Sequence, residues 1–134
     1  MAAFVSYAQN FEDVMLWRAL SSVPDGFYID VGAGDPDQHT VTRAFYERGW
    51  HGINIDPDPV CFAALERRRD RDINIPVALA EAPGQRRFHV VSVPGLSTLA
   101  SAVAFRHRAR GWDVRRVKVE VGTLAEICRL HAPR

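Results

Sequence analysis

The run Asp30-Val31-Gly32-Ala33-Gly34 contains the residue types that point most directly to ligand chemistry. It ends an apolar, β-rich segment, so the glycines are expected to form a loop at the end of a buried strand. Glycines at such a position let the backbone approach a ligand closely. In an open α/β sheet, this loop faces the crevice in which ligands bind. We therefore expect a binding site beside Gly32 and Gly34.

A second acid, Asp56, ends the next apolar segment. Its two carboxylate oxygens can accept both hydroxyls of an adenosine ribose. A dinucleotide-binding loop would share this acid but requires a third glycine, and position 37 is Asp37. Together with Asp30 and Asp35, this acid would repel a pyrophosphate but suit a ligand that carries a sulfonium and an amino group. The charges favour S-adenosylmethionine over NAD, and a turn that binds no ligand is the remaining alternative.

The elements that must position this loop follow from the spacing of apolar residues. In chain order we predict a helix at 7–21, a strand at 27–31, a helix at 41–49, a strand at 52–56, a helix opened by Pro57-Asp58-Pro59 and a strand at 73–79. This alternation is typical of a parallel sheet with helices on both faces. Pro76 removes a ladder hydrogen bond from the third strand, which favours an edge position.

The pattern changes in the second half of the chain. Apolar residues near 88–90 and 117–121 alternate with polar ones, as in half-exposed antiparallel strands. The long connection 94–113 contains a predicted helix at 99–109. Thr123 and Glu126 have the spacing of a capping box, which predicts a last helix.

Composition excludes several classes of function. A chain of 134 residues predicts one domain, 1–134, and 47% apolar with 25% charged residues is ordinary for a globular protein. The net charge of +1 provides no global field for nucleic acid. We find no apolar run long enough to span a membrane and no signal peptide. Cys61 and Cys128 are interpreted as two buried thiols and not as a disulfide or a zinc site, so a reducing, cytoplasmic location is expected.

Several motifs together resemble the FkbM-type methyltransferases, a branch of the Rossmann-like class I methyltransferases. The most specific are Tyr28-Ile29-Asp30-Val31-Gly32-Ala33-Gly34-Asp35-Pro36 and Arg48-Gly49-Trp50-His51-Gly52-Ile53-Asn54-Ile55-Asp56-Pro57. Segments 6–13, 72–80, 95–99 and 117–127 add weaker similarity, so the resemblance covers nearly the whole chain. It implies an S-adenosylmethionine-dependent O-methyltransferase that acts on a hydroxyl of a sugar, polysaccharide or polyketide-type acceptor.

The resemblance also implies roles for individual residues. Asp30, Gly32 and Gly34 would line the amino-acid end of the cofactor. Asp56 would hold the ribose, and it stands where Glu is more usual in the family. Ala78 would lie near the adenine.

The family pattern continues, after the Thr-Leu helix, into a strand that would lie beside strand 27–31. We therefore expect an incomplete domain, truncated before its fourth core strand. Strand 27–31 would then form an exposed edge, which favours self-association or pairing with a partner segment. A non-catalytic binding or scaffolding module derived from the same fold is the alternative function.

Some residues keep two interpretations. Gln9 either completes a capping box with Ser6 or contacts the cofactor. His39 is a candidate general base, and no metal site is predicted from its neighbouring acids. The basic series near the end of the chain is either a solvated face or a site for an anionic acceptor, such as a phosphate-bearing sugar; its members are Arg106, Arg108, Arg110, Arg115, Arg116 and Lys118. Ser97 and Thr98 either position a substrate hydroxyl or cap a helix.

Overall fold

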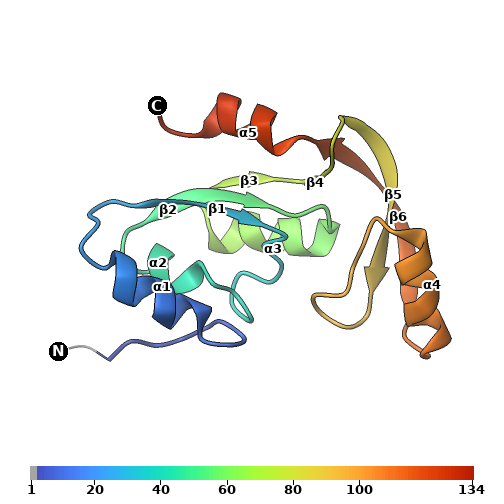
Figure 1. Cartoon of the computed structure of the whole chain (residues 1–134), viewed down its shortest axis with the longest axis horizontal. Helices are drawn as coiled ribbons and strands as arrows, with labels where there is room; N and C mark the ends of the chain where they lie inside the picture. The colour runs from blue at the N-terminus through green and yellow to red at the C-terminus, as the bar shows by residue number, and fades with distance from the viewer. Residues whose placement is uncertain (1–2) are drawn as a thin grey trace.

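The fold, given by a computed structural model that describes residues 3–134, consists of two small sheets with five helices (Figure 1). In chain order the elements are α1 (Glu12–Leu20), β1 (Phe27–Val31), α2 (Arg43–Tyr46), β2 (His51–Ile55), α3 (Pro59–Arg68), β3 (Ile73–Ile75), β4 (Val77–Leu79), β5 (Gly84–Val91), α4 (Ser101–Ala109), β6 (Val114–Gly122) and α5 (Leu124–His131). The strand orders are β1-β2-β3 and β4-β6-β5. The chain is therefore an α/β protein.

The first sheet is parallel and lies between helices, as predicted. β2 pairs with β1 on one side and with β3 on the other. Its Ile53 and Ile55 pack against Ile127 of α5. Figure 1 shows α5 on this face and α1, α2 and α3 on the opposite face. Ile53 and Ile55 share this face of β2, and Asn54 between them is buried on the other face. β2 is therefore covered on both faces, as the central strand of a parallel sheet requires.

The prediction of a single strand at 73–79 was wrong. Pro76 separates β3, in the first sheet, from β4, which pairs with β6 in the second sheet. Proline has no N–H and a fixed φ, so it cannot continue the ladder with β2. The chain leaves the first sheet at this residue, and β3 becomes that sheet's edge.

The second sheet confirms the predicted antiparallel pairing. β5 pairs with β6 along its whole length, from Gly84 opposite Val121 to Val91 opposite Val114. Its core consists of Ala78, Phe88, Val119 and Val121. Figure 1 shows this pair curving away from the first sheet, with α4 at its far end. The helix predicted at 99–109 is thus confirmed, with α4 beginning at Ser101.

The prediction that the first helix begins near residue 7 with a Ser6–Gln9 capping box was also wrong. The helix begins at Glu12, and its N-cap residue makes no side-chain cap bond. The buried carboxylate of Asp13 instead accepts hydrogen bonds from Ser6 Oγ at 2.7 Å and Tyr7 N at 2.7 Å. An ionised acceptor is a stronger partner than a neutral cap, so it holds this segment outside the helix. The cap at Thr123 is present as predicted. The helix predicted to open at Pro57-Asp58-Pro59 is α3, and the side chain of Asp58 caps it.

A buried polar network lies beneath the first sheet. Asp72 accepts hydrogen bonds from Tyr28 Oη at 2.6 Å, Gly52 N at 2.8 Å and Asn54 Nδ2 at 2.8 Å. The guanidinium of Arg69, which is 2% exposed, lies 3.6 Å from the same carboxylate. Burial and the bond to Asp72 raise the pKa of Tyr28, so its hydroxyl remains a donor. The network ties β1, β2 and the end of α3 together.

The guanidinium of Arg69 also holds the segment that follows the glycine loop. It donates to the carbonyl oxygen of Pro36 at 3.0 Å, to Thr40 Oγ1 at 3.2 Å and to Thr42 Oγ1 at 3.3 Å. A guanidinium only donates, so the hydroxyl hydrogen of Thr42 is free to bond Asp30, 2.7 Å away. This chain of bonds connects the buried network to the carboxyl end of β1.

Within residues 3–134, β1 has β2 as its only strand partner. Ile29 is 36% exposed and Val31 is 53% exposed. The free edge of β1 therefore presents backbone groups and apolar side chains to solvent. No helix in the described part of the chain has the length and apolar composition needed to cross a bilayer.

Candidate functional site

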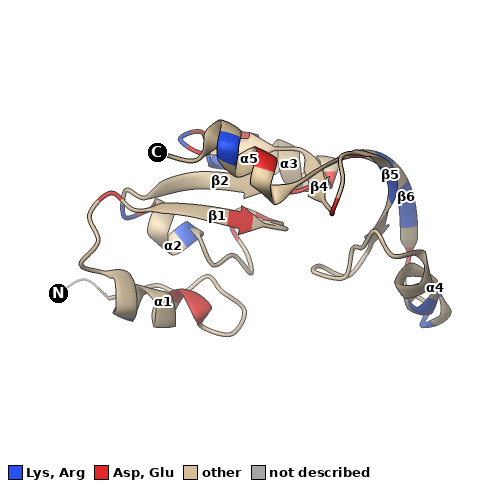
Figure 2. Cartoon of the chain, turned by 45° about the horizontal axis from the view of Figure 1, so that its top comes forward, with Lys and Arg blue, Asp and Glu red and all other residues tan. Residues whose placement is uncertain are grey.

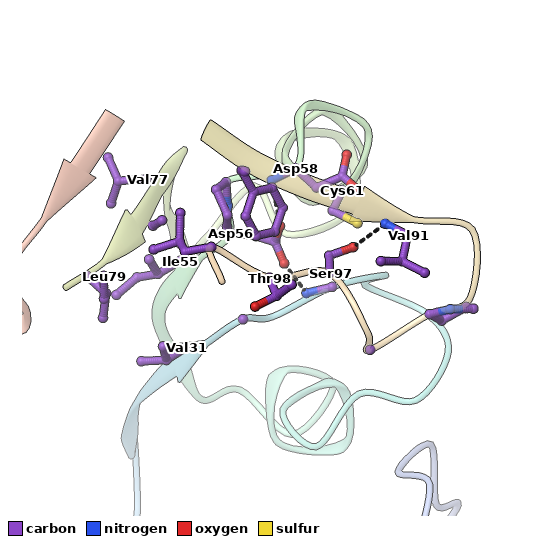
Figure 3. Close-up of a pocket in the computed structure, with 18 of the residues that line it drawn as sticks. Val31, Ile55, Asp56, Asp58, Cys61, Val77, Leu79, Val91, Ser97 and Thr98 are labelled. Carbon is purple, nitrogen blue, oxygen red and sulfur yellow. Dashed lines mark hydrogen bonds between the residues drawn. The ribbon is translucent and has the colours of Figure 1, made fainter. Parts of the chain in front are cut away.

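A cavity of about 600 Å³ lies where β1 and β2 end, facing the second sheet. Gly32, Gly34 and Asp56 line it on the side of the first sheet. Ala78 and the loop 92–99 line the opposite side. Figure 3 shows Asp56, Cys61, Ser97 and Thr98 among the side chains that line this cavity. The cavity is therefore at the carboxyl edge of the parallel strands, where ligands bind in open α/β sheets.

The glycine loop is fixed by the end of the neighbouring strand. Gly32 N and Ala33 N both donate to the carbonyl oxygen of Ile55, at 2.8 and 3.2 Å. Gly32 and Gly34 have φ angles of 69° and 67°, which glycine adopts without strain. A Cβ at Gly32 would meet no atom within 4 Å. The loop thus keeps open space above its backbone.

Asp56 is the acid that the structure builds most firmly into the cavity. It is 7% exposed, and its Oδ2 and Oδ1 accept hydrogen bonds from Gly34 N at 2.7 Å and from Asp58 N at 2.8 Å. Burial raises the pKa of Asp56 above the ordinary aspartate value, and these two backbone bonds oppose that effect. Each carboxylate oxygen has two lone pairs, so both retain capacity for a further donor.

The opposite wall belongs to β5 and the loop that follows it. Ser97 Oγ accepts a hydrogen bond from Val91 N at 3.0 Å, and Thr98 Oγ1 accepts one from Ala100 N at 3.0 Å. The backbone of Thr98 also pairs with that of His89. Both residues line the cavity, and their hydroxyl bonds hold this wall in place beside β5.

Of the seven predicted site residues, four line the cavity: Gly32, Gly34, Asp56 and Ala78. Asp30 does not line the cavity, because its carboxylate accepts the hydrogen bond from Thr42 on the other side of β1. Burial raises the pKa of Asp30. Gln9 and His39 are exposed and lie outside the lining. The segments that carry Gln9 and His39 meet each other outside the cavity, where Thr40 N donates to the carbonyl oxygen of Tyr7 at 3.1 Å.

Sequence reasoning missed the apolar and thiol parts of the lining. Phe88 was placed in a half-exposed strand without a role in the site; it is 7% exposed and lines the cavity. Cys61 lines it from the first turn of α3, three residues after the N-cap Asp58. That spacing places both residues on one side of the helix, and it was the sequence signal that could have predicted Cys61 in the lining. Burial, with the charges of Asp56 and Asp58, raises the pKa of Cys61 to about 12, so the thiol stays protonated.

The described residues contain no group of three or more His, Cys, Asp or Glu side chains that could hold a metal ion. The acids Asp35 and Asp37 near His39 have other partners. Asp35 Oδ1 accepts bonds from Asp37 N and Gln38 N, and Asp37 pairs with Arg68 at 3.1 Å. These acids organise the loop after Gly34.

Comparison with known proteins identifies a family. Residues 30–134 match the family described as the methyltransferase FkbM domain. No curated protein and no solved structure matches the chain. The matched region spans most of the chain and includes the glycine loop, Asp56 and all of the cavity lining. The chain belongs to the FkbM methyltransferase domain family.

Proposed function

We propose that the chain forms the S-adenosylmethionine site of an O-methyltransferase. The observation that carries this proposal is the cavity at the ends of β1 and β2, where the glycine loop and the carboxylate of Asp56 meet. Membership of a methyltransferase family makes a methyl donor the expected ligand. A class I, Rossmann-like methyltransferase fold with the domain 1–134 is part of the same proposal.

The lining has the size and chemistry that this cofactor requires. About 600 Å³ lies within the range of small-molecule and cofactor sites. Ile55, Ala78 and Phe88 provide apolar surface for an adenine. Asp56 retains two acceptor positions for the ribose hydroxyls. Gly32 and Gly34 leave room for the amino-acid end, with Asp30 as a proposed support behind them through Thr42.

The charges of the cavity also suit this ligand. Asp35, Asp56 and Asp58 line it, and no Lys or Arg is present in the lining. Carboxylates attract a sulfonium and an ammonium and repel a pyrophosphate. The protonated thiol of Cys61 adds no charge of its own. The lining therefore favours S-adenosylmethionine over NAD.

When bound, the cofactor supplies an electrophilic methyl group. The residues of the chain would hold it, exclude water and orient an acceptor hydroxyl. His39 remains the proposed base for the hydroxyl proton and Gln9 a proposed cofactor contact, although neither lines the cavity. A sugar, polysaccharide or polyketide-type acceptor and a cytoplasmic location complete the proposal. A non-catalytic module of the same fold is the second candidate, favoured by the free edge of β1 beside the cavity.

Equilibrium dialysis with radiolabelled S-adenosylmethionine tests this proposal. We expect saturable binding that is about 10-fold weaker or more in Asp56→Asn, since a hydrogen bond to a charged group contributes roughly 1.5–3 kcal/mol. Asp25→Asn changes an exposed aspartate in a turn and should bind as the wild type does. Stronger competition by NAD than by unlabelled S-adenosylmethionine would refute the assignment. Binding without methyl transfer to any acceptor would favour the non-catalytic module.

A further inference from the structure

One face of the β5–β6 pair concentrates positive charge. In the antiparallel register Arg87 lies opposite Lys118, and His89 lies opposite Arg116. Residues two apart on a strand share a face, and directly opposed residues share it too. All four side chains therefore occupy the same face of the second sheet. Figure 2 shows the blue of Lys and Arg on β5, β6 and α4.

α4 contributes a further cation at the end of this face. Its Ser101 Oγ lies 3.3 Å from His89 Nε2, so the helix packs over the imidazole. Its Arg108 donates to the carbonyl oxygen of Val114, at the start of β6, at 3.4 Å. Burial, and then the charges of Arg116, Arg108 and Arg87, lower the pKa of His89. The field of these arginines thus converges on one buried imidazole. We call the group Arg87, Arg108, Arg116 and Lys118 the basic face.

The fold does not neutralise this charge. None of the ion pairs formed within residues 3–134 includes a member of the basic face. The nearest acid along the same side of β6 is Glu120, which accepts a hydrogen bond from Gln85. Like charges directly opposite each other, as at Arg87 and Lys118, destabilise a sheet. The arrangement therefore costs the fold stability, and an anion bound there would reverse that cost.

The basic face meets the candidate cofactor cavity at β5. The backbone of His89 pairs with that of Thr98, which lines the cavity. Val91 also lines the cavity and shares the side of β5 that carries Arg87 and His89, whereas Phe88 lines the cavity from the opposite side of the strand. The cavity therefore reaches the basic side of β5 at its Val91 end. A ligand that reaches from the cavity across β5 would place an anionic group on the basic face.

We propose that the basic face binds the phosphate or pyrophosphate group of a phosphorylated sugar acceptor whose hydroxyl enters the cavity. Three of its four cations are arginines, whose planar forks match phosphate oxygens. A nucleic acid is disfavoured, because its binding depends on neutralising a series of backbone phosphates and the face has four cations in a chain of net charge +1. This inference rests on the proposed function only in naming the ligand a methyl acceptor.

Calorimetry at fixed ionic strength, without S-adenosylmethionine, tests the site with inorganic pyrophosphate, glucose 1-phosphate and glucose. We expect the wild type to bind the two phosphate compounds and not glucose. Arg87→Gln/Arg116→Gln should weaken that binding by at least about tenfold. Arg18→Gln/Arg67→Gln removes the same charge from exposed helix positions elsewhere and should stay within about twofold of the wild type.

Three results would overturn the proposal. The first is no phosphate binding by the wild type, or equal binding by both double variants. The second is equal binding of glucose and its phosphate. The third is binding of a single-stranded oligonucleotide alone, which would assign the face to nucleic acid. Binding of S-adenosylmethionine is measured separately through Asp56, so failure of this proposal and failure of the proposed function give different results.

Discussion

The buried carboxylate of Asp72 allows a quantitative test of how the fold supports the site. Its side chain is fully buried and accepts three hydrogen bonds, from Tyr28, Gly52 and Asn54, beside the guanidinium of Arg69. Asp72→Ala would leave these donors and a buried positive charge without a partner. Removing one member of a buried ion pair costs about 3–5 kcal/mol. We expect a loss of this size in the free energy of unfolding, a large part of the stability of a small domain.

Urea denaturation followed by circular dichroism measures this loss. Asp70→Ala is the matched control, because Asp70 is exposed and accepts one hydrogen bond from Tyr46 at 2.7 Å. We expect it to cost about 1 kcal/mol or less. In the double variant Arg69→Met/Asp72→Asn, the Asp72 substitution should lower the free energy of unfolding by less than it does alone, because the buried charge of Arg69 is no longer left without a partner. Equal losses for Asp72→Ala and Asp70→Ala would refute the view that this network supports the ends of β1 and β2.

Three further predictions concern the cavity and the sheet edge. Burial raises the pKa of Asp56, and ribose hydroxyls would favour its ionised form. Affinity for S-adenosylmethionine should therefore fall as the pH is lowered, and the fall should begin above the ordinary aspartate range. Calorimetry across pH should show this fall in the wild type and not in Asp56→Asn. Gly32→Val should abolish S-adenosylmethionine binding in a folded protein. Gly49→Val is the control, because Gly49 also has a positive φ, 91°, but lies outside the cavity; both variants should lose about 1–2 kcal/mol of stability, and Gly49→Val should still bind. Equal affinities of the two variants would show that the loop is only a turn. Ile29→Lys should reduce self-association through the edge of β1 in analytical ultracentrifugation, and Val60→Lys, exposed on α3, should not; a wild type that is monomeric at all concentrations would contradict this.

The order of elements was predictable wherever local chemistry and burial agreed. Gly32 and Asp56 follow apolar strands, so periodicity was enough to place them at one edge of the sheet. The break at Pro76 was not resolved, because a missing N–H predicts an edge but not a change of sheet. The predicted start of α1 was wrong because Asp13, distant from the expected cap, accepts hydrogen bonds from the segment before the helix. Arg87 was missed because a basic face across β5 and β6 depends on the register between two strands.

The central claim is that the cavity between the glycine loop and β4 binds S-adenosylmethionine. Titration of the ¹⁵N-labelled protein, followed by NMR, tests it directly and detects weak binding as well as tight binding. We expect S-adenosylmethionine to shift the amide signals of Gly32, Gly34 and Ala78, with the basic face unaffected and with no such shifts in Asp56→Asn. Shifts confined to α4 and β6, or larger shifts of the same three amides with NAD, would contradict the account.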